Sequence, residues 1–259
     1  MAVDIHAAAD GKAPIIELDG IEMRFGTNRV LEDVNFRVDS GEVVGLVGDN
    51  GAGKSTLVKI ITGYHKPVKG TIRFRGQTRT FANPGDARAV GIETVYQDLA
   101  LADEMSLWRN FFLGKEMVYR IGPLRILRRR TMREICEAAL KEIGLTRFRS
   151  AEAYAASLSG GERQSLAITR AVHFGAVLLL LDEPTASLSV KETRKVLSSI
   201  EAAKGKGLGV VYIDHNVSHV HPVADRIVLL QHGRVAANVP RGTATLEELN
   251  ELIAAPVSA

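Results

Sequence analysis

Hydrophobic residues recur along this chain with two different periods. Short runs of branched apolar residues bounded by turn residues predict strands, and longer segments with one apolar face predict helices. The predicted strands are Ile15–Leu18, Val43–Val47, Thr71–Phe74, Val177–Leu181, Gly209–Ile213 and Arg226–Leu230, and the predicted helices are Lys54–Thr62, Lys191–Ala203, Val217–Val223 and Leu246–Ala254. Because strands and helices alternate, the pattern favours an α/β sheet fold.

The stretch from about Asp98 to Phe174 interrupts this alternation. It shows no convincing strand pattern, and its helical patterns lie at Ser106–Leu113, Thr131–Ile143 and Gly161–Val172. We therefore predict a helical subdomain over 98–174, inserted into a single domain over 15–255. Its core, with a β-rich N-terminal part, comprises 15–97 and 175–255, and a flexible tail over 1–14 precedes it.

Composition narrows the class of protein. A chain of 259 residues suits one large domain with a subdomain, and 46% hydrophobic with 24% charged residues is typical of a soluble globular protein. The longest apolar runs, such as Ala176–Leu181, are far shorter than the roughly 18 residues of a membrane-spanning helix. Residues 1–14 lack the pattern of a secretory signal. A membrane role would therefore require a partner.

Charge and cysteine content exclude further classes. A net charge of +3 is too weak to indicate nucleic acid as a partner without a concentrated basic patch. The single cysteine, Cys136, excludes an internal disulfide framework, and we expect it to pack on a helix.

A glycine-rich loop follows the second predicted strand. Gly48-Asp49-Asn50-Gly51-Ala52-Gly53-Lys54-Ser55 fits the pattern G-x-x-x-x-G-K-[ST] between a strand and a helix. In this pattern backbone N–H groups surround phosphate oxygens, the lysine reaches the β and γ phosphates, and the serine ligates Mg²⁺. We expect residues 48–56 to bind a nucleoside triphosphate. An ordinary glycine-rich turn is the alternative, and Thr56 disfavours a dinucleotide fold because that fold places a third glycine there.

Two carboxylates end a buried predicted strand. Val177–Leu181 is followed by Asp182 and Glu183. Asp182 is placed to hold Mg²⁺ through water, and Glu183 to polarise an attacking water. The alternative is an acidic strand end that meets solvent or caps the helix beyond Pro184.

A third motif distinguishes one family of nucleotide-binding proteins. Leu158-Ser159-Gly160-Gly161-Glu162-Arg163-Gln164 precedes a helical pattern. The Ser159 hydroxyl and the N–H groups of Gly160 and Gly161 at a helix start form a second phosphate-binding surface. Ser159 and Glu162 also have the spacing of a capping box, and the two roles are compatible. The heptad, and its order relative to the other two motifs, resemble those of ATP-binding-cassette ATPases.

This resemblance implies ATP and Mg²⁺ as ligands, ATP hydrolysis, and the fold of a P-loop ATPase with a β-rich part and an inserted helical subdomain. It adds three residues to the site. Gln97 matches a glutamine that contacts Mg²⁺ and reports occupancy to a membrane subunit, and His215 matches a histidine on the γ-phosphate. Phe25 matches an aromatic residue that lies against adenine. The implied catalytic set is Lys54, Gln97, Glu183 and His215.

The resemblance also implies a dimer. In this dimer the heptad Leu158–Gln164, called the signature below, covers in one copy the nucleotide that the other copy holds. The chain contains one set of motifs, so pairing with itself is the simplest expectation. Two positions depart from the family pattern. Ser189 stands where an aspartate is usual, which puts communication between the two ATP sites in doubt, and Asp214 stands where serine is frequent, which we interpret as local tuning.

Two segments bear on the partner. Leu99–Gly114 carries the only tryptophan and two phenylalanines. Such residues at helical spacing more often form a core, and the alternative, favoured by the position after Gln97, is a groove for a helix of a membrane subunit. Arg120, Arg125 and Arg128–Arg130 form a basic run, for which a solvated helix start is the expected interpretation and contact with anionic lipid the alternative.

The sequence around the motifs is similar to that of ribose-, xylose- and fructose-type importer ATPases. In carrying a single cassette, the chain is similar to the fructose-importer variety. This implies import of a small sugar, with fructose as one candidate, by a homodimer bound to integral membrane permease subunits. A periplasmic sugar-binding protein is an indirect partner, and the location is peripheral, on the cytoplasmic face of the inner (plasma) membrane.

Two rival functions remain. A soluble cassette ATPase for assembly or remodelling, such as iron-sulfur cluster biogenesis, has the same motifs. A regulatory module without turnover is disfavoured by Glu183 and His215.

Overall fold

The structure, a computed structural model, describes residues 13–142 and 150–254 and consists of two compact units. The first unit contains 13–96, 176–184 and 203–254, and the second contains 97–142, 150–175 and 185–202. The predicted tail over 1–14 lies almost wholly outside the described residues. The division differs from the sequence-derived boundaries at 185–202, which group with the second unit by their contacts, whereas the sequence placed them in the core.

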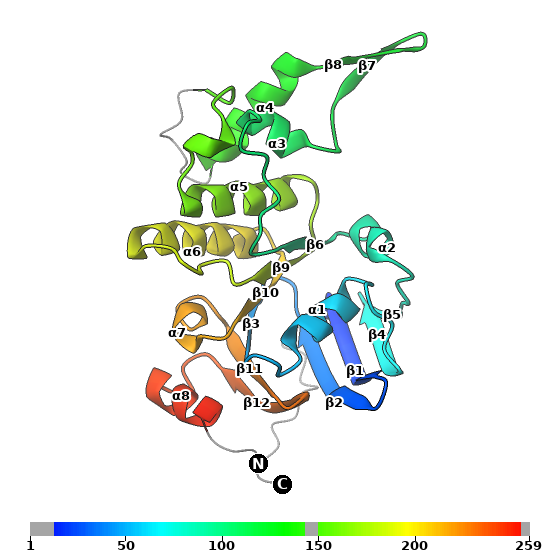
Figure 1. Ribbon diagram of the computed structural model, residues 1–259, viewed down its shortest axis with the longest axis vertical. Coiled ribbons are helices and arrows are strands. Elements are labelled where there is room, and N and C mark those ends of the chain that lie inside the picture. Colours follow the sequence, from blue (N-terminus) through cyan, green and yellow to red (C-terminus); the bar gives the residue numbers. More distant parts are fainter. Residues whose placement is uncertain (1–12, 143–149, 255–259) are drawn as a thin grey trace. The chain divides into compact units, whose positions relative to one another are not determined.

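A six-stranded sheet forms the centre of the first unit (Figure 1). All neighbouring strands are parallel except β11 and β12, which are antiparallel. The strands, in spatial order, are β12 (Arg234–Pro240), β11 (Arg226–Gln231), β3 (Val43–Val47), β10 (Gly209–Asp214), β9 (Leu178–Asp182) and β6 (Ile92–Val95). The three strands β3, β10 and β9 are buried almost throughout, as expected for parallel strands covered on both faces. The α/β prediction is therefore confirmed.

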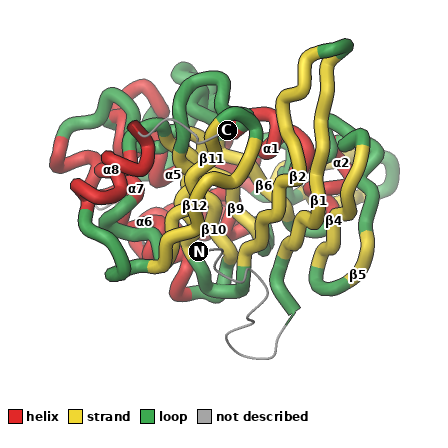
Figure 2. The backbone as a smooth tube through the Cα atoms, turned by 90° about the horizontal axis from the view of Figure 1, so that it is seen from below, coloured by secondary structure: helices red, strands yellow, loops and turns green. Residues whose placement is uncertain are grey.

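A second, antiparallel sheet contains most of the N-terminal strands, seen in yellow in Figure 2. Its strands are, in order, β2 (Asn28–Val38), β1 (Ile16–Phe25), β4 (Lys69–Phe74) and β5 (Gln77–Thr78). The sequence predicted only part of β1 and β4. It missed β2 because two irregularities break the alternation of apolar and polar residues that marks a strand. Asp33 has φ 50°, and the pairing of β2 with β1 contains register shifts.

The core of the first unit joins both sheets and a helix. One hydrophobic cluster contains Leu18 and Phe36 of the antiparallel sheet, Leu46 and Val211 of the parallel sheet, and Ile60 of a helix. The helices of this unit are α1 (Lys54–Ile61), α2 (Pro84–Ala89), α7 (Val217–Val220) and α8 (Leu246–Ala254). This packing fixes the end of β3 against the start of α1.

The second unit is mainly helical. Its helices are α3 (Leu107–Phe112), α4 (Arg129–Glu142), a single 3₁₀ turn (Ala155–Ser157), α5 (Gly160–His173) and α6 (Val190–Gly205), whose last residues belong to the first unit. It also contains an antiparallel hairpin, β7 (Val118–Ile121) and β8 (Leu124–Leu127). The expectation that 98–174 contains no strand is therefore wrong. Arginines interrupt the apolar runs and conceal the two short strands.

The aromatic residues of α3 lie in the core of the second unit. Trp108 is 3% exposed, Phe111 and Phe112 are buried, and all three pack with Cys136, Leu166 and other residues. The Trp108 indole N–H donates to Glu152 Oε2 at 3.0 Å. The groove interpretation is wrong for these three side chains, and the packing role of Cys136 is confirmed. In the described ranges, no helix is both long and apolar enough to cross a bilayer.

Candidate functional site

The loop predicted to bind phosphate joins the buried strand β3 to α1. Two of its glycines are required by packing, since a Cβ on Gly48 would lie 2.1 Å from the Leu230 carbonyl oxygen and a Cβ on Gly53 would lie 2.7 Å from Leu31 Cδ2. No side chain caps the start of α1 at Gly53. The first N–H groups of α1 are therefore available to an external anion.

Other predicted loop residues lie along the same turn. Ala52 is buried, and its N–H donates to the Asp49 carbonyl oxygen at 3.1 Å. Asp49, Asn50, Gly51 and Ser55 are exposed, and Thr56 is half-buried. The exposed Ser55 hydroxyl lies in the first turn of α1, where it can serve as an oxygen ligand.

Lys54 holds a positive charge inside this loop. Its side chain is buried, and Nζ donates to the carbonyl oxygens of Gly48 and, at 3.0 Å, Asp49. Burial lowers the pKa of Lys54, and the carboxylates of Glu183 and three aspartates act in the opposite direction. The ammonium group thus lies in a site that additional negative charge would stabilise.

The parallel register brings the acidic residues to the same edge of the sheet. Asp182 at the end of β9 pairs with Ile213, and Asp214 at the end of β10 pairs with Val47 of β3. Glu183 follows directly, and its N–H donates to the Ile213 carbonyl oxygen at 2.9 Å. Glu183 has φ 47°, a left-handed conformation that costs a non-glycine residue about 1–2 kcal/mol.

Glu183, Asp214 and His215 form a compact group. His215 Nδ1 lies 2.8 Å from Glu183 Oε1 and 3.5 Å from Asp214 Oδ1. Asp214 is 1% exposed, accepts from the Asn216 N–H at 2.9 Å, and lies 3.0 Å from His219 Nδ1. The structure thus gives Asp214 a larger role than local tuning, because its buried carboxylate organises the loop that presents His215.

Negative charge accumulates around Asp182. Burial raises the pKa of Asp182, and the charges of Glu183 and Asp214 raise it further, while Lys54 opposes the change. A cation would relieve this repulsion, and the oxygen donors of Asp182 and Ser55 are of the kind that Mg²⁺ prefers. The residues present therefore fit a magnesium ion beside a bound phosphate.

The signature residues lie in the second unit, at the start of α5. Glu162 Oε2 accepts from the Ser159 N–H at 3.0 Å, which is one arm of the capping box that the sequence spacing predicts. Lys195 Nζ donates to the other Glu162 oxygen at 2.8 Å. Gly161 is required by packing, because a Cβ there would lie 2.8 Å from Glu192 Cβ.

Glu192 is a residue that the sequence analysis missed. Its Oε2 accepts from the Ser189 hydroxyl at 2.7 Å and from the Ser189 N–H at 3.1 Å. The Glu192 N–H in turn donates to the Ser189 hydroxyl oxygen at 3.4 Å, so Ser189 caps the start of α6. Hydrogen bonds from Ser189, and then from the Ser159 hydroxyl and the Gly161 N–H, lower the pKa of Glu192 to about 2. Glu192 therefore joins the cap of α6 to the signature, and its S-x-x-E spacing from Ser189 is the signal that could have identified it.

The two remaining predicted residues are Phe25 and Gln97. Phe25 ends β1, is 46% exposed, and makes an edge contact with His65 at 5.2 Å between ring centroids. Gln97 is exposed and is the first residue of the second unit. The first unit thus brings together Lys54, Asp182, Glu183 and His215, while Ser159, Gly160, Gly161 and Gln97 belong to the second.

Comparison with known proteins assigns the family. The sequence pattern of the ABC transporter family matches residues 31–186. The xylose/arabinose import ATP-binding protein of Sulfolobus acidocaldarius is 42% identical over 239 residues, which are 92% of this chain and 93% of that protein. The fructose import ATP-binding protein of Rhizobium meliloti is 42% identical over 225 residues, 85% of this chain and 86% of that protein.

The fold agrees with this assignment. A nucleotide-free ATP-binding cassette from an ABC transporter superposes with a TM-score of 0.76, at 24% identity, over 94% of this chain and 96% of that one. The chain belongs to the ABC transporter family. Within that family it is a nucleotide-binding ATPase.

We predict that Asp182→Asn raises the melting temperature of the nucleotide-free protein by a few degrees at pH 7 to 8. The folded state raises the pKa of Asp182, so folding disfavours the ionised carboxylate, and an uncharged amide removes that cost. The difference from wild type should shrink as the pH falls and wild-type Asp182 becomes protonated. Thermal unfolding is the measurement, with Asp98→Asn on an exposed aspartate as control, and a lower melting temperature at neutral pH would contradict the prediction.

We predict that Ser189→Ala destabilises the protein by about 1 kcal/mol through loss of the α6 cap, whereas Ser189→Thr, which keeps both the capping oxygen and the hydroxyl donor to Glu192, stays within a few tenths. Because Glu192 has its pKa lowered from 4.5 to about 2, its contribution is present above about pH 4.5 and is lost as the pH falls towards 2. The cost of Ser189→Ala should therefore shrink over that range. Urea unfolding at several pH values tests this, and equal stability of both variants at pH 7 would refute it.

Proposed function

We propose that this chain is the ATP-hydrolysing subunit of an importer for a small sugar, with fructose as one candidate. The convergence of Lys54, Asp182, Glu183 and His215 at one edge of the parallel sheet carries the proposal. The identity of 42% to xylose/arabinose and fructose import proteins, over most of each chain, supports the substrate class.

The loop of residues 48–56 binds the phosphates of ATP. The uncapped start of α1 faces the β and γ phosphate oxygens, and Lys54 exchanges its carbonyl partners for phosphate oxygens. This exchange is favourable because the ammonium group is already desolvated, so binding does not have to remove its hydration shell. Phe25, at the exposed end of β1, lies against the adenine ring.

Glu183 and His215 carry out the chemical step. Glu183 accepts a hydrogen bond from the attacking water and takes its proton as the water oxygen bonds to the γ-phosphorus; the bond to the β–γ bridging oxygen breaks and ADP leaves. His215 uses Nδ1 to hold the Glu183 carboxylate, and its Nε2 faces the γ-phosphate. Ser55 and Asp182 would hold Mg²⁺, which when bound would neutralise charge on the phosphate oxygens. The role of Gln97 as a further ligand rests on the resemblance alone.

Each site is completed by a second copy of the chain. Ser159, Gly160 and Gly161 contact the γ-phosphate held by the partner copy, so ATP joins the two copies and hydrolysis releases them. Permease subunits receive this movement at the cytoplasmic face of the membrane, and a periplasmic sugar-binding protein delivers the sugar to them.

We predict that Glu183→Gln lowers ATP turnover by at least about 100-fold and traps an ATP-bound dimer. The amide preserves the shape of the site but cannot take the proton from water, so ATP persists between the two copies. Size-exclusion chromatography with saturating ATP and Mg²⁺ is the measurement. Lys54→Ala is the control, because weakened nucleotide binding should leave that variant monomeric. A monomeric Glu183→Gln protein would contradict the proposal that ATP joins two copies of the chain.

We predict that the chain, recovered from gently solubilised membranes, brings with it a multi-span permease, and that sugar-loaded binding protein stimulates the ATPase of the complex several-fold. Empty binding protein is the control. Recovery of soluble assembly factors alone, with no response to any sugar, would leave the ATPase chemistry intact and move the protein to the assembly or remodelling class.

A further inference from the structure

The hairpin of β7 and β8 has one wholly apolar face. Tyr119 pairs with Ile126, and Ile121 pairs with Leu124. Paired residues, and residues two apart along a strand, share a face of a sheet. These four side chains are 53%, 50%, 61% and 63% exposed respectively. A two-stranded hairpin is marginally stable in water, and an exposed apolar patch marks a contact surface.

The opposite face carries an arginine pair beside the apolar pair Val118 and Leu127, and the base of the hairpin is strongly basic. Arg120 pairs with Arg125 on the face opposite the apolar side chains. Residues 118–133 contain six arginines and no acidic residue. Among the residues that the structure describes, only two of the six, Arg130 and Arg133, have an acidic partner. The hairpin and the start of α4 therefore carry a concentrated positive charge that the acidic residues of the described part of the chain neutralise only in part.

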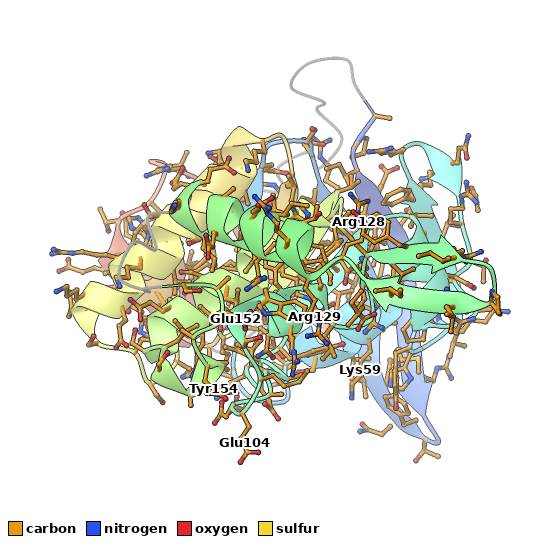
Figure 3. All side chains as sticks on the ribbon, turned by 90° about the horizontal axis from the view of Figure 1, so that it is seen from above. Lys59, Glu104, Arg128, Arg129, Glu152 and Tyr154 are labelled. Atoms are coloured by element: carbon orange, nitrogen blue, oxygen red, sulfur yellow. The ribbon has the colours of Figure 1, made fainter. Side chains whose placement is uncertain are left out.

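A hollow of about 700 Å³ connects the basic and apolar surfaces. Tyr119 and Ile126 of the apolar face line it, and the Arg128 guanidinium lies 4.8 Å from the centre of the Tyr119 ring. Figure 3 shows Arg128 and Arg129 at the base of the hairpin, where β8 leads into α4. The arginines that line the hollow are Arg125, Arg128, Arg129, Arg130 and Arg133.

We propose that this hairpin is a membrane-contact element for anionic lipid. The apolar face enters the boundary between headgroups and acyl chains, and the arginines bind headgroup phosphates in and around the hollow. The tip suits insertion because Ile121, Gly122, Pro123 and Leu124 carry no charge. Arginine side chains combine with buried apolar residues in this way at membrane interfaces, where either signal alone binds weakly.

Charge favours lipid over the other possible occupants. A second copy of the hairpin would bring two sets of arginines together, which disfavours self-association. A protein partner would need an acidic rim around an apolar groove, whereas a bilayer with anionic lipid offers both chemistries continuously. The basic run Arg120, Arg125 and Arg128–Arg130 is thus more than the solvated helix start expected from the sequence, because only two of its five residues, Arg129 and Arg130, lie in α4.

Vesicle flotation of the full chain tests the proposal without nucleotide, sugar or permease, so its failure would leave the proposed ATPase function untouched. The vesicles contain phosphatidylcholine alone or with phosphatidylglycerol. We expect binding to the anionic vesicles only, and a decrease of binding with added salt.

Two double variants separate the contributions of charge and apolar area. Arg120→Gln with Arg125→Gln, and Ile121→Ser with Leu124→Ser, should each weaken binding to anionic vesicles about tenfold or more. The matched controls are Arg79→Gln with Arg88→Gln, and Val68→Ser with Leu113→Ser, which change exposed residues elsewhere and should bind as wild type does.

A fluorescent reporter locates the contact. Tyr119→Trp adds a second tryptophan, and the existing Trp108 is buried in the core of the second unit. We expect the emission to shift to shorter wavelength with anionic vesicles and to remain unchanged with neutral ones. The wild-type chain should show no shift, which also verifies that Trp108 reports no unfolding.

Four results would overturn the proposal. Equal binding to neutral and anionic vesicles, or equal losses in the hairpin and control variants, would remove the hairpin as the lipid contact. A third result would be self-association of the chain in the absence of vesicles as its concentration rises. If Ile121→Ser with Leu124→Ser abolishes that self-association, the apolar face belongs to a contact with a second copy. Photocrosslinking from position 119 to a permease subunit, without vesicle binding, would assign it to a protein.

Discussion

The buried ammonium group of Lys54 is the constraint on which the candidate site depends. It replaces water with two carbonyl oxygens of its own loop, which requires the tight backbone that Gly48 and Gly53 allow. The carboxylates at the ends of β9 and β10 then balance its charge at a distance set by the register of the parallel sheet. A shift of one strand by a single residue would remove this balance and turn the acidic side chains into the core.

The sequence indicates the parts of the molecule that depend on local pattern. Buried parallel strands read as continuous apolar runs, and the phosphate loop and signature are linear motifs, so β3, β9, β10 and the loop residues were all predicted. Features that depend on pairing between distant segments were not. Strand β2 is defined by its pairing with β1, and β7 and β8 by their pairing with each other. The arginines in and after the hairpin make its sequence look like a polar helix start.

The same reasoning explains which site residues were missed. Asp214 acts through His219 on another element, and Glu192 acts through Ser159 and Gly161, which are distant in the chain. No motif marks Asp214, and only the spacing from Ser189 marks Glu192. Trp108 shows the opposite error, since its position after Gln97 suggested a surface groove, but burial with Phe111 and Phe112 decided its place. Proximity in sequence to a functional residue is a poor guide to exposure, because successive positions of a helix point in different directions.

The left-handed backbone of Glu183 has a consequence for how this sequence can drift. Glycine or asparagine would adopt φ 47° at lower conformational cost, so mutation in a chain that needed only to fold would tend to replace this glutamate. Its presence there means that a penalty on folding has been tolerated in exchange for a carboxylate beside His215. A cassette lineage that ceased to hydrolyse ATP should lose its glutamate at this position early, well before the phosphate loop decays.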